Sequence, residues 1–207
     1  MLFRSIDVSR TPVNMRAISR VIEASGQMSG DYREHRRLQQ QKAGPMKISE
    51  AYTYCGSDKN TVHHYGPFYD GLVETLRPRT VLEVGVHKGA SLRAWRHVGY
   101  PVEAIGIDRQ RVEGVPMIVA TAPDFGPVLT QLEGRKFDLI IDDGSHVLSH
   151  QLAAVDQLQQ LLEPGGYFVV EDLQNQQAID EFRVRGWSFF DRRDSGRYDD
   201  IIAFQQF

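Results

Sequence analysis

The chain has 207 residues, of which 41% are hydrophobic and 25% charged, and its formal net charge is −3. This composition is typical of a globular protein with one domain and a modest extension, and the charge does not indicate a nucleic-acid partner. The one cysteine, Cys55, cannot form an internal disulfide, so we expect a reducing, cytoplasmic location. No apolar run is long enough for a signal peptide or a transmembrane helix, and we expect no association with a membrane.

The segment 1–45 is the most basic part of the chain, with eight Lys or Arg residues against four Asp or Glu. Its charge is therefore +4, which leaves −7 for the remaining residues. Thr11-Pro12 and Asp31 are typical starts of two helices, and Gly44-Pro45 follows the second. We expect an N-terminal helical arm that packs on the core, forms a lid or mediates association, including a possible homo-oligomer. A solvated helical face would have the same charge pattern.

A polar loop is expected at Cys55–Tyr65, followed by a helix at Pro67–Leu76 whose apolar residues recur on one face. The loop is dense in side chains that could contact a ligand. His63 and His64 are adjacent, so they point in different directions and lack the spacing of metal ligands. We expect them to have a structural or ligand-contacting role.

The first expected strand is the β-branched run Val81–Val84, and Gly85 and Gly89 flank a tight turn from it into a helix. Glycines allow the backbone to approach a ligand closely, and a helix N-terminus favours polar or negative groups. The spacing is G-x-x-x-G rather than G-x-G-x-x-G, so the pyrophosphate-binding fingerprint of dinucleotide enzymes is absent. Glu83, just before the first glycine, fits a cationic ligand better than a pyrophosphate.

The next expected strand, Ala104–Asp108, ends in an acid about 20 residues after the glycines. Asp108 is therefore well placed to accept hydrogen bonds from the two hydroxyls of a ribose. An ordinary acid at a strand end is the alternative. We expect a strand at Met117–Ala120 and a helix at Asp124–Leu132 to follow.

A strand at Phe137–Ile141, a helix at Val147–Leu162 and a strand at Tyr167–Val170 form a βαβ unit, and Pro164-Gly165-Gly166 should separate the helix from the second strand. The two strands of such a unit must be parallel. Their carboxyl ends therefore lie at the same edge of the sheet, where α/β proteins bind ligands.

Two pairs of acids follow these strands, Asp142-Asp143 and Glu171-Asp172, and His146 lies in the first turn. Four carboxylates in one place repel one another unless a cation is present, so the pattern predicts a metal site. As the alternative, the acids are ordinary turn residues, and Asp143 caps the following helix.

A short helix at Gln174–Phe182 and two strands around a Ser195-Gly196 turn are the last expected elements. The two strands would form an antiparallel hairpin at the edge of the sheet.

Taken together, Glu83-x-Gly85-x-x-x-Gly89, Asp108 and Asp142-Asp143 resemble the class I S-adenosylmethionine-dependent methyltransferases. The resemblance implies an α/β fold, namely a doubly wound, seven-stranded, mostly parallel, Rossmann-like sheet with an antiparallel C-terminal hairpin. The order of strands and helices given above is consistent with it. We therefore expect an N-terminal helical arm at 1–45 and a methyltransferase domain at 46–207.

Several segments resemble, more narrowly, the metal-dependent sugar O-methyltransferases of macrolide biosynthesis, the rhamnosyl O-methyltransferases and the cephalosporin hydroxylase-like proteins. They are Gly56–Lys59 with His63 and Tyr65, Leu82–Leu92 with Trp95, Ile140–His146 with His150, and Pro164–Asp172. This resemblance implies that Asp143, Glu171 and Asp172 bind Mg²⁺ and that His146 is the catalytic base. For S-adenosylmethionine we expect contacts from Glu83, Gly85, Gly89, Ser91, Asp108, Asp142, Lys59 and Tyr65.

The function implied is methylation of a hydroxyl of a sugar or another vicinal diol, in a natural product or a glycan. Oxygen coordination to Mg²⁺ would stabilise the developing alkoxide, and His146 would accept its proton. Two alternatives are a hydroxylase-like metal enzyme on the same scaffold and a non-catalytic cofactor-binding or assembly protein. An iron oxygenase would prefer two His and one carboxylate, which the predicted all-carboxylate set does not provide.

Overall fold

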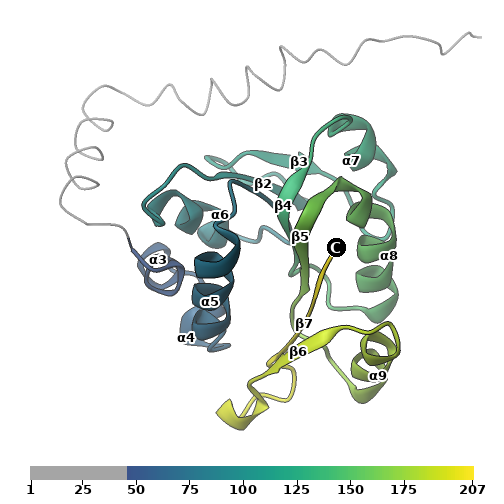
Figure 1. The fold of residues 1–207 in the computed structure, drawn as a ribbon. Helices are drawn as coiled ribbons and strands as arrows, with labels where there is room; N and C mark the ends of the chain where they lie inside the picture. The colour runs from purple at the N-terminus through teal and green to yellow at the C-terminus, as the bar shows by residue number, and fades with distance from the viewer. Residues whose placement is uncertain (1–45) are drawn as a thin grey trace, which may run out of the picture.

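The computed structural model describes residues 46–207, so the expected arm at 1–45 lies outside the described residues. The described chain forms one seven-stranded sheet, and helices cover both of its faces (Figure 1). The strands are β1 (Thr80–Val84), β2 (Glu103–Asp108), β3 (Met117–Val119), β4 (Phe137–Asp142), β5 (Leu162–Val170), β6 (Ser188–Asp191) and β7 (Ile201–Gln206). Within residues 46–207, no helix combines the length and the apolar character needed to cross a membrane.

The strand order is β3-β2-β1-β4-β5-β7-β6. Strands β1 to β5 pair in parallel, whereas β7 is antiparallel to both β5 and β6. This arrangement confirms the predicted doubly wound, mostly parallel sheet and its antiparallel C-terminal hairpin. The chain leaves β1 towards β2 on one side and later returns to β4 on the other. Such a switch point is where α/β sheets form a crevice for ligands.

Four helices, α3 (Ile48–Cys55), α4 (Asp58–Thr61), α5 (Gly66–Leu76) and α6 (Ala90–Ala94), lie on one face of the sheet. The other face is covered by α7 (Gly126–Gln131), α8 (Leu148–Leu158) and α9 (Gln176–Val184), as Figure 1 shows. Three short 3-10 helices complete the elements: Trp95–His97, Gln159–Leu161 and Arg193–Ser195.

Each face of the sheet has its own apolar core, because successive strand residues point to opposite sides. Leu82 and Ile140 belong to the core under α7, α8 and α9. Val81 and Leu139 belong to the core under α3, α5 and α6. All four side chains are buried, and this burial fixes the register of the central strands.

Two local predictions were wrong. The polar segment Cys55–Tyr65 contains the helix α4, because Gly56, with φ 78°, ends α3 and Ser57 caps the new helix. Pro164-Gly165-Gly166 lies inside β5 instead of before it. The pairing of β5 with β4 shifts register between Phe137 and Leu139, and such an irregularity accommodates proline within a strand. The helix α3 was not predicted at all.

Candidate active site

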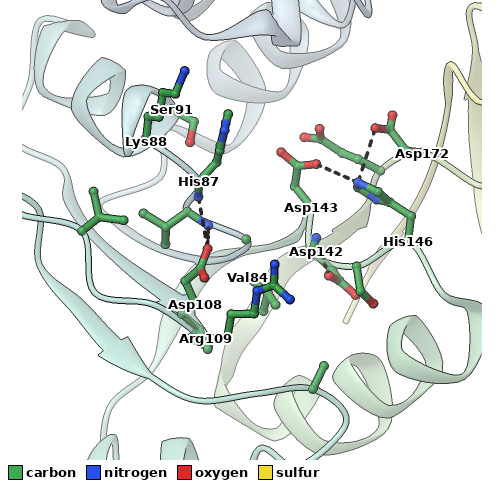
Figure 2. Close-up of a pocket in the computed structure, with 18 of the residues that line it drawn as sticks. Val84, His87, Lys88, Ser91, Asp108, Arg109, Asp142, Asp143, His146 and Asp172 are labelled. Carbon is green, nitrogen blue, oxygen red and sulfur yellow. Dashed lines mark hydrogen bonds and ion pairs between the residues drawn. The ribbon is translucent and has the colours of Figure 1, made fainter.

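The carboxyl ends of β1, β2, β4 and β5 surround a cavity of about 1260 Å³ (Figure 2). Pockets for a single small molecule usually measure about 300–1,000 Å³. This cavity therefore has room for a cofactor and a second molecule side by side. Its walls include the glycine turn after β1, the acid after β2 and the acids after β4 and β5.

Gly85 brings the turn after β1 against the turn after β4. Its φ is +89°, and a Cβ at this position would lie 1.9 Å from the backbone oxygen of Asp143. The backbone N–H of Asp143 donates to the carbonyl of Val84 at 2.8 Å, and the N–H of Gly85 donates to the carbonyl of Ile107 at 2.8 Å. Only glycine fits here, because any side chain would separate the two turns.

Asp108 lies at the cavity wall with its carboxylate held by backbone groups. Its Oδ2 accepts hydrogen bonds from the N–H groups of Val86 at 2.9 Å and His87 at 3.1 Å, and its Oδ1 accepts from Gln110 at 3.0 Å (Figure 2). Although partial burial acts in the opposite direction, these N–H groups hold the pKa of Asp108 below its usual value. The carboxylate is therefore charged and fixed in orientation before any ligand arrives.

The eight residues expected to contact the cofactor divide into two groups. Those that line the cavity are Gly85, Ser91, Asp108, Asp142 and Lys59. Glu83, Gly89 and Tyr65 are not among the lining residues. Glu83 is fully buried, and both of its side-chain oxygens lie within 2.8 Å of Ser91 Oγ. In this structure Glu83 therefore holds the side chain of Ser91 by hydrogen bonds.

Asp142 and Asp143 point in different directions, as the strand alternation requires (Figure 2). Asp142 is buried, and its Oδ1 accepts a hydrogen bond from the N–H of Gly144 at 3.1 Å. Burial raises the pKa of Asp142 to about 7. Asp143 does not cap the following helix, because the N-cap of α8 is Val147. The simple alternative of a helix-capping Asp143 is therefore wrong.

Asp143, His146 and Asp172 converge, and we call this set the open acid group. The Nε2 atom of His146 lies 3.9 Å from Asp143 Oδ1 and 3.9 Å from Asp172 Oδ2 (Figure 2). One potential ligand atom from each residue lies within 4.8 Å of the other two. His146 and Asp172 also have positive φ values, 57° and 55°. Such strained backbone persists where the surroundings hold it, often at functional sites.

Glu171 also lines the cavity but is not a member of the open acid group. Lys59 Nζ donates to Glu171 Oε2 at 2.7 Å and to Asp143 Oδ2 at 2.5 Å. The hydroxyl of Tyr69 donates to the second oxygen, Glu171 Oε1. Both oxygens of Glu171 are therefore engaged by buried side chains. Of the three predicted metal ligands, Asp143 and Asp172 each turn one oxygen to the group, whereas Glu171 faces Lys59.

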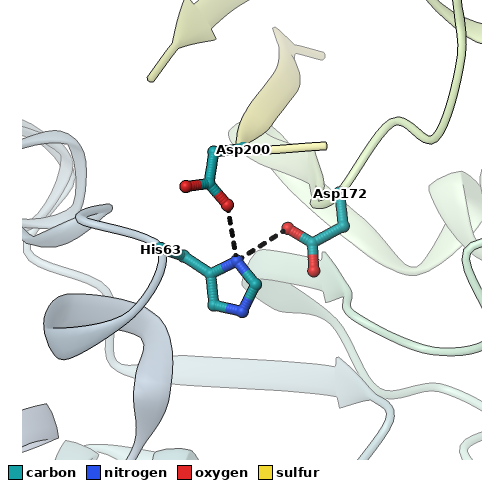
Figure 3. Close-up of side chains that lie close together, drawn as sticks. All are labelled: His63, Asp172 and Asp200. Atoms are coloured by element: carbon teal, nitrogen blue, oxygen red, sulfur yellow. Dashed lines mark hydrogen bonds and ion pairs between the residues drawn. The ribbon is translucent and has the colours of Figure 1, made fainter. Parts of the chain in front are cut away.

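A second group joins His63, Asp172 and Asp200 (Figure 3). The Nδ1 atom of His63 lies 2.9 Å from Asp200 Oδ1 and 3.4 Å from Asp172 Oδ1. Sequence reasoning considered His63 but missed Asp200 and Tyr69. The Asp199-Asp200 pair before the last strand was the available signal for Asp200. Tyr69 gave none, because its ring fits an ordinary apolar helix face.

The open acid group fits a divalent cation of the Mg²⁺ type. Mg²⁺ prefers carboxylate oxygens, and two carboxylates each direct one oxygen towards the same point. Burial, with the neighbouring Asp143 carboxylate, raises the pKa of Asp172 above its usual value. A cation between the two carboxylates would relieve that repulsion.

The sheet order, the glycine turn and the acid after β2 together define a Rossmann-like methyltransferase fold. A family model described as a methyltransferase domain matches residues 58–202 of the chain. The chain therefore belongs to this family of methyltransferase domains.

Sequence relatives of the chain are named as O-methyltransferases. The 8-demethyl-8-alpha-L-rhamnosyl tetracenomycin-C 2'-O-methyltransferase of Streptomyces olivaceus is 36% identical over 134 residues, which is 58% of this chain and 35% of that protein. The demethylmacrocin O-methyltransferase of Streptomyces fradiae is 33% identical over 129 residues, 55% of this chain and 32% of that protein. The chain thus aligns with about a third of the length of these curated relatives.

Among solved structures, the MycE methyltransferase of the mycinamycin biosynthetic pathway has the same fold. Its complex with Mg, SAH and mycinamycin VI matches with a TM-score of 0.63 and 22% sequence identity. The match covers 78% of this chain and 55% of MycE. This similarity confirms the predicted fold class.

Proposed function

We propose that the chain transfers a methyl group from S-adenosylmethionine to a hydroxyl of a sugar or another vicinal diol in a Mg²⁺-dependent reaction. The observation that carries the proposal is the location of the open acid group. Asp143, His146 and Asp172 line the same cavity as Gly85 and Asp108. The residues proposed to activate the hydroxyl and those proposed to bind the nucleoside thus line one cavity.

On the cofactor side, Asp108 would accept hydrogen bonds from the ribose hydroxyls. Its two oxygens are already oriented by three backbone N–H groups, so little order has to be created on binding. Gly85 would allow the cofactor to approach the backbone closely, and Ser91, Asp142 and Lys59 contribute to the same wall. Glu83 and Gly89 would act indirectly, by shaping this turn.

On the acceptor side, Asp143 and Asp172 would hold Mg²⁺. Glu171 is the third expected ligand, and it would join them only after releasing Lys59 or Tyr69. When bound, S-adenosylmethionine supplies the methyl group and Mg²⁺ stabilises negative charge on the acceptor oxygen. A vicinal diol suits this site because its two hydroxyls can be held together, which orients one of them for transfer.

His146 would accept the proton of the reacting hydroxyl. Its Nε2 lies 3.9 Å from both carboxylates, too far for a hydrogen bond, so neither carboxylate occupies the atom that would meet the substrate. Mg²⁺ prefers oxygen ligands, which leaves the imidazole for proton transfer.

An iron-dependent hydroxylase is less compatible with the geometry. Iron oxygenases of this type use two His and one carboxylate. Each of the two groups found in residues 46–207 has one His and two carboxylates. A carboxylate-rich site favours the methyltransferase assignment over this alternative.

The first test is calorimetric titration of the purified protein with S-adenosylmethionine, with and without Mg²⁺. We expect a cofactor heat and a separate Mg²⁺ heat that is lost in Asp143→Ala. Methyl transfer is then measured with rhamnosides and with a catechol as a non-sugar diol. EDTA should abolish activity and Mg²⁺ should restore it. Activity that is unchanged by EDTA and by Mg²⁺ would contradict the proposed role of the metal. A protein that does not bind the cofactor would contradict the whole proposal.

A further inference from the structure

We infer that Lys59 and Tyr65 are positioning residues that aim one oxygen of Asp143 and one oxygen of Asp172 into the metal site by holding the other. The inference rests on the proposed function and assigns new roles to two side chains that sequence reasoning placed in the cofactor site. Both come from one short stretch of chain, since Lys59 lies in α4 and Tyr65 is the N-cap of α5.

Lys59 holds Asp143. Its side chain is almost completely buried, and its Nζ lies 2.5 Å from Asp143 Oδ2, 2.7 Å from Glu171 Oε2 and 3.5 Å from Glu83 Oε1. The ammonium thus lies among three carboxylates and reaches Asp143 and Glu171 at hydrogen-bond distance. With Oδ2 engaged in this way, Asp143 turns Oδ1 towards His146, 3.9 Å away.

Tyr65 holds Asp172 in the same manner. Its ring is fully buried and stacks on His63, with centroids 5.4 Å apart. Its hydroxyl donates to Asp172 Oδ1 at 2.6 Å, and His63 Nδ1 lies 3.4 Å from the same oxygen. Asp172 then turns Oδ2 towards His146, again 3.9 Å away. Each ligand carboxylate therefore has one restrained oxygen and one oxygen that faces the open acid group.

Tyr69 provides a matched contrast one helical turn later. It is also a fully buried tyrosine whose hydroxyl donates to a carboxylate, in this case Glu171 Oε1. The second oxygen of Glu171 is held by Lys59 at 2.7 Å. Tyr69 thus serves a carboxylate with no oxygen free for a cation, whereas Tyr65 serves one that has an oxygen free.

The physical reason for such support is orientation. A carboxylate that rotates freely must be ordered when it binds a metal, whereas one that is already held gives up less freedom. Partners of metal-ligating side chains typically contribute about 10–100-fold to metal affinity. Asp172 also has a strained backbone conformation, with φ 55°, and such a conformation persists only where the surrounding structure holds it.

The test compares Tyr65→Phe with Tyr69→Phe. Each variant removes one buried hydroxyl and keeps the ring, so the two losses of packing are alike. Mg²⁺ affinity of each full-length protein is measured by calorimetry without an acceptor, and S-adenosylmethionine affinity is measured beside it. We expect Tyr65→Phe to weaken Mg²⁺ binding by about 10-fold or more. Tyr69→Phe should leave Mg²⁺ affinity close to that of the wild type, and both variants should bind the cofactor normally.

The variant Lys59→Met distinguishes the positioning effect of Lys59 on Mg²⁺ affinity from the effect of its positive charge. Removing a positive charge beside the site would by itself strengthen the binding of a divalent cation. Loss of positioning predicts the opposite, a Mg²⁺ affinity weakened by about 10-fold. Tighter Mg²⁺ binding in Lys59→Met would overturn the role given to Lys59, and the tyrosine pair is interpreted alone if this variant does not fold.

The outcomes also separate this inference from the proposed function. Equal Mg²⁺ binding by the wild type and Tyr65→Phe would overturn the inference while leaving the metal site intact. Equal weakening in Tyr65→Phe and Tyr69→Phe would show that the hydroxyl of Tyr65 has no particular role at the metal site, and it would overturn the inference as well. A wild-type protein that gives no Mg²⁺ heat would instead refute the proposed function itself, and the inference with it.

Discussion

The two ends of the cavity are built in different ways. At the end proposed to bind the nucleoside (the nucleoside end), Asp108 is held by three backbone N–H groups from the turns beside it. At the end proposed to bind the metal (the metal end), Asp143 and Asp172 are held by the side chains of Lys59 and Tyr65, which belong to another layer of the fold. Hydrogen bonds from backbone N–H groups persist when the side chains of the donor residues are substituted. Hydrogen bonds from a side chain are lost when its hydroxyl or ammonium group is removed. The metal end should therefore be the more sensitive of the two.

Charge separates the two ends as well. The N–H groups around Asp108 lower its pKa despite partial burial, so its charge is stabilised. Burial raises the pKa of Glu171 and Asp172 at the other end. An accumulation of desolvated carboxylates with a raised pKa is typical of functional sites, and here a bound cation would lower its cost.

The largest expected effect comes from His146. We predict that His146→Ala reduces methyl transfer by about 10²–10⁴-fold, the usual contribution of a general base. Cofactor affinity should stay within about 2-fold of the wild type, since the nucleoside end is built without His146. His150→Ala is the control, because His150 also lines the cavity but its Nδ1 lies 2.8 Å from Ser145 Oγ. Full activity in His146→Ala would refute the assignment of the base.

The next effect tests the point where the two ends meet. Gly85→Ala should destabilise the fold by roughly 3 kcal/mol, because a Cβ combines a positive φ with a backbone clash. Gly134→Ala is the matched control, since Gly134 also has a positive φ, +75°, but nothing lies within 4 Å of its Cβ position. It should cost only about 1 kcal/mol. Urea unfolding measures both, and equal losses would mean that the two turns are not tightly packed.

A smaller pair of effects should show that the two ends bind their ligands independently. We expect Asp143→Asn to weaken Mg²⁺ binding by about 100-fold and to leave cofactor affinity nearly unchanged. Asp108→Asn should do the reverse, weakening cofactor binding by about 10-fold through the loss of a charged acceptor. Calorimetry with each ligand alone gives the four affinities. If either variant weakened the binding of Mg²⁺ and of the cofactor equally, the two ends would not be independent.

The smallest effect concerns pH. The folded pKa of Asp108 is below its unfolded value, so its contribution to stability is present above a pH of about 4 and is lost as the pH falls through the folded pKa. The wild type should therefore melt at a higher temperature than Asp108→Asn at pH 6. The gap should narrow below pH 4, as Asp108 takes up its proton. A gap that stays constant with pH would show that the carboxylate charge contributes nothing.

Much of the nucleoside end could be predicted from sequence, because its residues act where the chain places them. Gly85 follows a strand and Asp108 ends the next one, and a parallel pair of strands brings such ends together. The same rule predicted that Asp143 and Asp172 would meet at one edge, and they do. Local sequence therefore determined the strands, their order along the chain and the edge of the sheet at which these side chains meet.

The direction of each side chain at that edge was decided by tertiary packing. Lys59 is 84 positions from Asp143, and Tyr65 is 107 positions from Asp172. No periodicity links residues so far apart, and the unpredicted helix α3 packs in the layer that carries them. Glu171 and Asp172 are adjacent in the chain, yet one faces Lys59 and the other faces His146. Adjacent carboxylates diverge because backbone geometry sends them to different sides, and only the helices packed there determine which partner each one finds.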